Sequence, residues 1–127
     1  MKRFAAHRIF LPPDMVFPLH VIELDDHHCI QRLFPLENEI SQTFFFNGIL
    51  LLLNQKMILE PFLQTIKNEM LADRSDLSIL QFLMQSALPA LEKDDPVFLY
   101  VLERIPLLTK QSESFVHPTT IQVRQIY

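Results

Sequence analysis

Residues Phe44 to Leu53 read FFFNGILLLL, which is the longest apolar run in the sequence and the stretch on which the fold prediction depends. Spanning a bilayer as a helix takes roughly 20 apolar residues, and this run is shorter and contains Asn47 and Gly48. The run is therefore predicted to be a buried pair of strands, and no membrane-spanning segment is expected.

Shorter apolar runs precede this stretch, and each is followed by a cluster of turn-forming residues. The intervening clusters read PPD, DDHH and PLENE, and residues of these types favour turns between strands. Residues 4–53 are therefore predicted to form short strands, at Phe4 to Leu11, Phe17 to Leu24, Cys29 to Phe34 and Thr43 to Leu53.

After the strands, the apolar residues follow a helical period. They recur at spacings of three and four, which is typical of one face of a helix, at Leu59, Phe62, Leu63, Ile66 and Met70. Pro61 suits the first turn of such a helix, because a proline there removes no helical hydrogen bond.

A second helix is predicted to begin at Ser78. The residues Ser78-Ile79-Leu80-Gln81 fit a capping box, and Leu77 and Phe82 stand where a hydrophobic staple would form. Pro89 is expected to kink or end this helix, so the helical segment covers residues 59–92.

The last part of the sequence returns to strands. Val97 to Ile105 is nearly all apolar, as in a strand covered on both faces, and a half-exposed strand is predicted for Ile121 to Tyr127. The strands of residues 4–53 and 97–127 should share one sheet. The fold class is therefore predicted as α+β: a small β-sandwich or roll built from N- and C-terminal strands, with two helices inserted in the middle of a single domain, residues 1–127.

Composition excludes several functions. The chain has 127 residues and a net charge of −4, so it lacks the broad basic field that attracts nucleic acid. A single glycine rules out the glycine-rich loops that cradle phosphates. The lone cysteine, Cys29, excludes an intrachain disulfide and favours a cytoplasmic location.

Asp25, Asp26, His27, His28 and Cys29 follow one another and contain most kinds of metal-ligating side chain. Ligands on a strand must converge from one face at a spacing of two, whereas these are adjacent. Because strand-like runs flank the cluster, a hairpin turn is predicted, in which Asp and His tolerate a positive φ. The alternative is a metal site formed by His27, His28, Asp25 and Asp26. No catalytic residue and no cofactor are predicted.

The segments MKRFAAHRIF, VIELDDHHCIQRLF and FFFNGILLLL together resemble the start of metal-dependent hydrolases of the amidohydrolase superfamily. In that family, N-terminal strands lead into a TIM barrel through a segment that carries two metal-binding histidines. The chain then returns to the small β domain through a late helix and strands. Three later segments are similar to that return: Asp76 to Phe82, Pro96 to Glu103 and Ile121 to Arg124.

The resemblance breaks down at the metal-binding motif. When Asn54 to Glu60 is laid over the family's N-A-H-C-H-L-E, Lys56 and Ile58 occupy both histidine positions. A lysine ammonium has no lone pair for a metal, and isoleucine has no donor atom. A TIM barrel also takes about 250 residues, more than this chain contains. The resemblance therefore implies the small β domain of an amidohydrolase whose catalytic barrel is missing.

The function predicted from these observations is a non-catalytic structural or protein-interaction module. Without a barrel, one face of the domain needs another cover, so a homodimer or a protein partner is expected, with Phe and Leu side chains of the helical segment or of an edge strand at the interface. The alternatives are a small metal-dependent hydrolase with a rebuilt site at Asp25–Cys29, and a small-ligand-binding module with a phenylalanine-lined pocket between helices and sheet.

Overall fold

The computed structural model describes residues 1–38, 41–57, 59–70, 76–92, 94–106 and 119–127. Within them the elements are strands β1 (Lys2–Leu11), β2 (Met15–Leu24), β3 (Ile30–Pro35), β4 (Thr43–Asn54), β5 (Val97–Pro106) and β6 (Thr119–Gln125), and helices α1 (Glu60–Met70) and α2 (Asp76–Gln85).

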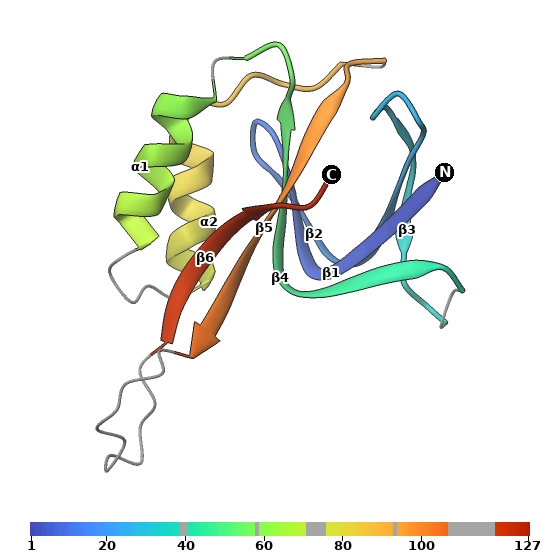
Figure 1. Ribbon diagram of the computed structural model, residues 1–127, viewed down its shortest axis with the longest axis horizontal. Coiled ribbons are helices and arrows are strands. Elements are labelled where there is room, and N and C mark those ends of the chain that lie inside the picture. Colours follow the sequence, from blue (N-terminus) through green and yellow to red (C-terminus); the bar gives the residue numbers. More distant parts are fainter. Residues whose placement is uncertain (39–40, 58, 71–75, 93, 107–118) are drawn as a thin grey trace.

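The strands of the described residues form one mixed sheet in the order β3-β2-β1-β4-β5-β6. β1 and β4 pair in parallel, and the other neighbours pair antiparallel. Both helices lie between β4 and β5 in sequence and lie together on one side of the sheet (Figure 1). The α+β class, the inserted helices and the sheet shared by the first and last strands are therefore confirmed.

The apolar run Phe44 to Leu53 is one strand, so the prediction of a strand pair was wrong. β4 continues through Asn47 and Gly48 because it pairs with β1 before and after these residues, with a shift of register between, and with β5 from Gly48 onward. Gly48 is needed there, since a Cβ on this residue would overlap the backbone carbonyl oxygen of Leu102. β4 and β5 pair from Gly48 to Asn54. The first part of β4 turns away from β5 (Figure 1).

One face of the sheet is covered by the helices. Alternate residues of β4, including Ile49, Leu51 and Leu53, point to this face, as period-two geometry requires. The apolar residues predicted for α1 pack against them, which confirms the helical face. The buried members of this cluster are Phe10, Ile49, Leu51, Leu53, Ile66, Ile79, Leu80, Leu83, Leu88, Tyr100 and Leu102.

The opposite face has an apolar cluster of its own. Ile30 and Leu33 of β3 share it with Leu99 and Val101 of β5, although these two strands are not neighbours in the sheet. The β2–β3 turn also reaches the start of β5, where Cys29 forms an isolated bridge with Pro96. The sheet therefore curls far enough for distant strands to pack on each other. Its finer description as a sandwich or a roll stays a prediction.

Both ends of α2 differ from the prediction. The helix includes Asp76 and Leu77, so Ser78 lies inside it and is not its N-cap. Leu77 is 68% exposed and does not form the expected staple with Phe82. At the other end the helix stops at Gln85, before Pro89. Ala87 there adopts a φ of 52°, the left-handed conformation that commonly ends helices.

Glu23 is a buried charged residue, with only 3% of its surface exposed. Its carboxylate accepts hydrogen bonds from Arg3 Nε at 2.8 Å and from Arg32 Nη2 at 3.0 Å, across the β1, β2 and β3 strands. Hydrogen bonds from Arg32 and then Arg3 lower the pKa of the Glu23 carboxyl, against the opposing effect of burial. This triad joins the three N-terminal strands.

No helix in the described ranges is both long enough and apolar enough to cross a membrane. The predictions at Ile58, and those for the side chains of Met70 and Ile121, lie outside the described residues.

Candidate functional site

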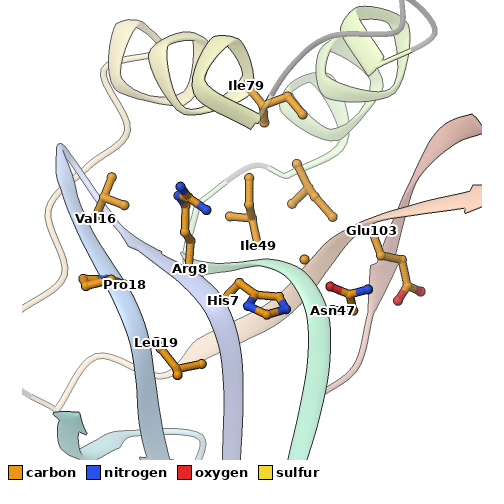
Figure 2. Close-up of a pocket in the computed structure, with 11 residues that line it drawn as sticks. His7, Arg8, Val16, Pro18, Leu19, Asn47, Ile49, Ile79 and Glu103 are labelled. Atoms are coloured by element: carbon orange, nitrogen blue, oxygen red, sulfur yellow. The ribbon is translucent and has the colours of Figure 1, made fainter. Parts of the chain in front are cut away.

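The sheet and α2 enclose a pocket of about 460 Å³ at the point where β4 and β5 diverge. We call it the fork pocket. Figure 2 shows the side chains of β1 and β2 around one side of it, with Ile79 of α2 above. It is lined by His7, Arg8, Val16, Pro18, Leu19, Asn47, Gly48, Ile49, Ile79, Leu102 and Glu103.

The polar side chains of the fork pocket differ in whether they have partners. Glu103 is paired, since it accepts hydrogen bonds from Arg124 Nη2 at 2.9 Å and Arg124 Nε at 3.2 Å. Arg8, by contrast, makes no hydrogen bond or ion pair with any described residue. Among the described residues the Asn47 side chain also has no hydrogen-bond partner, and the His7 ring meets only Phe45. The pocket thus holds hydrogen-bonding groups that the fold itself does not use.

The first part of β4 forms an open edge of the sheet. From Thr43 to Asn47, which we call the β4 edge, the strand pairs with β1 on one side and has no strand partner on its other side within the described residues. Phe44 and Phe45 are 57% and 50% exposed. The Phe45 ring meets His7 edge-on, with ring centroids 5.3 Å apart. This edge combines unpaired backbone with exposed aromatic rings next to the fork pocket.

The Asp25–Cys29 cluster is a hairpin turn between β2 and β3. The Asp25 carboxylate accepts hydrogen bonds from the backbone N–H of His27 at 2.8 Å, the N–H of Cys29 at 2.9 Å and Gln31 Nε2 at 2.8 Å. His28 takes a φ of 65°, which confirms the prediction that a histidine would adopt the positive φ of a glycine-free turn.

This turn also packs against the end of the chain. The His28 ring stacks on Tyr127 with ring centroids 4.0 Å apart, and the Tyr127 hydroxyl donates to the Asp25 carbonyl at 3.2 Å. Cys29 is only partly buried, because its turn lies at the sheet margin. Burial and, next, the Asp25 carboxylate raise the pKa of the Cys29 thiol, which keeps it protonated.

Two of the four residues proposed as alternative metal ligands make structural contacts, and the other two are exposed. Asp25 holds the turn and His28 lies against Tyr127, while Asp26 and His27 are exposed. Across the described parts of the chain, no group of three or more His, Cys, Asp and Glu side chains could hold a metal ion. Lys56, which the resemblance would place at a histidine position, is exposed in the turn after β4. The rebuilt hydrolase site stays a hypothesis.

Comparison with known proteins yields no match, since no family model, no curated protein and no solved structure matches this chain. The site must therefore be interpreted from its own geometry.

Sequence reasoning did not find the fork pocket. A pocket between helices and sheet was an alternative, but it was expected to be lined by phenylalanines, and none lines this one. His7 and Arg8 are adjacent, but they are far from Asn47 and from Glu103 in sequence, and the four residues belong to no motif. The one available signal was Gly48, because an isolated glycine in a buried strand indicates close backbone approach.

Replacing Asp25 with alanine is expected to lower the temperature of thermal unfolding, because three donors of the turn lose their acceptor. Hydrogen bonds, first that from Cys29, lower the pKa of Asp25 in the folded state. Its stabilising effect is therefore present above the unfolded-state pKa of about 3.9 and is lost as pH falls through the folded-state value.

The measurement is calorimetry from pH 7 downward, with Asp26→Ala as the matched control on an exposed neighbour. The difference in unfolding temperature between wild type and Asp25→Ala should become smaller at low pH. Equal unfolding temperatures for the two variants at pH 7 would contradict the structural role of Asp25.

Proposed function

We propose that this chain is a non-catalytic protein-interaction module that forms a homodimer through the β4 edge. The observation that carries the proposal is the pair of exposed rings, Phe44 and Phe45, on backbone that lacks a second strand partner among the described residues. An exposed, apolar strand edge is a template for pairing with another chain, and soluble proteins normally cover or charge such edges.

The sequence of the β4 edge suits pairing with a copy of itself. It reads T-F-F-F-N, carries no charge and is nearly symmetric about Phe45. In an antiparallel pair with a twofold axis at Phe45, that residue lies opposite Phe45 of the partner subunit. Phe44 then lies opposite Phe46 of the partner subunit. Aromatic cross-strand pairs stabilise sheets, and a twofold interface closes without leading to fibres.

The other two edges of the sheet favour pairing less. β3 carries Arg32 and ends in Pro35, and β6 carries Arg124. Charges and prolines on an edge strand oppose the addition of a further strand. The β4 edge is therefore the one that we assign to the interface.

Two finer points belong to the same proposal. The curl of the sheet, with β3 and β5 sharing one apolar cluster, supports a small β-roll, as the resemblance to the barrel-less β domain of an amidohydrolase would imply. The single cysteine, which is not in a disulfide, supports a cytoplasmic location.

Replacing Phe45 with glutamate is expected to convert the dimer into a monomer. Two carboxylates would face each other across the twofold axis, and the central aromatic pair would be lost. The measurement is sedimentation velocity at micromolar to high micromolar protein. Leu77→Glu is the matched control, because it places the same charge on a 68% exposed leucine of α2. A wild-type monomer across this range, or equal dissociation by both variants, would overturn the proposal.

Disulfide capture tests the register. In a Cys29→Ser background, Thr43→Cys with Asn47→Cys should give a covalent dimer on mild oxidation, because residue 43 lies opposite residue 47 of the second copy. Asn47→Cys alone should not, since its own counterpart is far along the strand. Equal crosslinking of the single and double variants would contradict the antiparallel register.

A further inference from the structure

We infer that the fork pocket is a binding site for a small carboxylate with an aliphatic body, anchored by Arg8. This site shares Asn47 with the β4 edge, but its anchor Arg8 lies on β1 outside that edge, so the inference does not depend on the proposed dimer. The inference starts from the contrast between the unused polar groups of the pocket and the apolar residues beside them.

The side chains that line the pocket include a positive charge that no negative charge of a described residue neutralises. Arg8 is permanently charged and has no ion-pair partner among the described residues. Glu103, the one acidic residue that lines the pocket, is neutralised by Arg124, whose Nη2 lies 2.9 Å from Glu103 Oε1. An anion entering the pocket therefore meets an uncompensated cation. A cationic ligand meets a carboxylate that already has its partner.

The polar groups near Arg8 are suited to a carboxylate. A guanidinium presents its N–H groups as a planar fork that can donate two parallel hydrogen bonds to one carboxylate. Figure 2 shows the Arg8 head group pointing into the pocket toward α2, with His7 and Asn47 on neighbouring strands. The imidazole and the carboxamide add further donors that no described residue uses.

The remaining wall of the pocket is apolar. It consists of side chains from β2, β4, β5 and α2: Val16, Pro18, Leu19, Ile49, Ile79 and Leu102. The volume of about 460 Å³ is in the range of small-molecule sites, roughly 300–1,000 Å³. An inorganic anion would leave this wall in contact with water, whereas an aliphatic chain would cover it. The combination therefore favours a carboxylate that carries an apolar body.

The test is an NMR titration of the ¹⁵N-labelled full chain with hexanoate, compared with hexan-1-ol, hexylamine and inorganic phosphate at the same ionic strength. Hexanoate is expected to shift the amide signals of pocket residues, those of Arg8, Asn47 and Gly48 first. Hexan-1-ol tests whether the ligand must carry a charge, and hexylamine tests whether that charge must be negative. Inorganic phosphate tests whether the ligand needs its aliphatic body. Each of the three should bind at least about tenfold more weakly, because each loses the charge-assisted contact or the apolar one.

Arg8→Gln should weaken hexanoate binding about tenfold or more. Arg8→Lys should recover only part of the loss, because lysine restores the positive charge but not the planar pair of N–H donors of the guanidinium. Arg8 is exposed and unpaired, so these variants should fold normally. Lys67→Gln on α1 is the control for a general loss of positive charge, and it should bind like wild type.

Three outcomes would overturn the inference. The first is the absence of saturable shifts, or shifts confined to residues outside the pocket. The second is equal binding of hexanoate by the Arg8→Gln and Lys67→Gln variants. The third is binding of hexan-1-ol, hexylamine or phosphate as tight as that of hexanoate.

Discussion

Replacing Gly48 with alanine is expected to lower the free energy of unfolding by about 2–3 kcal/mol, the cost typical of forcing extra atoms into a filled site. The added Cβ would overlap the carbonyl oxygen of Leu102, which is backbone and has no rotamer to change. Either β4 or β5 must move, and each of these strands has a neighbour on its other side in the sheet. Valine should destabilise further, because its methyl groups enlarge the overlap. Urea denaturation at pH 7 measures the effect.

Two controls separate this clash from other causes. Asn47→Ala adds no atoms on the adjacent residue and should change stability by less than about 0.5 kcal/mol. Leu102→Ala combined with Gly48→Ala should not restore stability, because the obstructing atom belongs to the backbone at Leu102. Wild-type stability of Gly48→Ala, or its rescue by Leu102→Ala, would show that the two strands do not approach as described.

Replacing Glu23 with alanine should cost roughly 2 kcal/mol at pH 7. Removing one partner of a fully buried ion pair costs about 3–5 kcal/mol, and the cost here is smaller because Arg3 and Arg32 keep 31% and 61% of their side-chain surface in water. The loss should exceed that of Arg32→Gln, since that change leaves Glu23 its contact with Arg3 at 2.8 Å. Urea denaturation of wild type, Glu23→Ala and Arg32→Gln measures the free energy of unfolding of each and so tests this order.

The Glu23 contribution should depend on pH in one direction. Hydrogen bonds from Arg32 and Arg3 lower the pKa of Glu23 in the folded state. Its stabilisation is therefore complete above the unfolded-state pKa of about 4.3 and is lost as pH falls through the lower folded-state value. The Glu23→Gln variant has no titratable carboxyl at this position, so it should lose less stability between pH 5 and 3 than wild type. Parallel profiles would contradict the paired, ionised state of Glu23.

The sequence pattern predicted the elements well where the pattern was local. Apolar runs bounded by turn-forming residues predicted β1, β2 and β3 within about two residues of their ends, and the spacing of Phe62, Leu63 and Ile66 predicted the buried face of α1. Errors arose where tertiary contacts outweighed a local signal. The run containing Asn47 and Gly48 was predicted as a pair of strands, but pairing with β1 on either side of these residues and with β5 from Gly48 onward makes it one strand, which bends there (Figure 1). Ser78 reads as an N-cap, but the helix begins earlier.

The candidate site was less predictable, because it depends on which strands become neighbours. The parallel pairing of β1 with β4 brings Arg8 beside Ile49, and the ladder with β5 places Gly48 opposite Glu103. Neither pairing has a signature in the sequence around those residues. The turn at Asp25 to His28, by contrast, is a local structure, and its hairpin geometry was predicted.

The order of the strands also has a consequence for how the chain acquires its structure. β1, β2 and β3 are joined by two consecutive hairpins, so they can pair early, as soon as this part of the chain has been synthesised. The central strand β4 must then add to β1, and β5 can join only after both helices have been synthesised. Until then the long apolar strand β4 has one side without its final neighbour. Chaperone binding to nascent chains should therefore be strongest in the interval between synthesis of β4 and of β5.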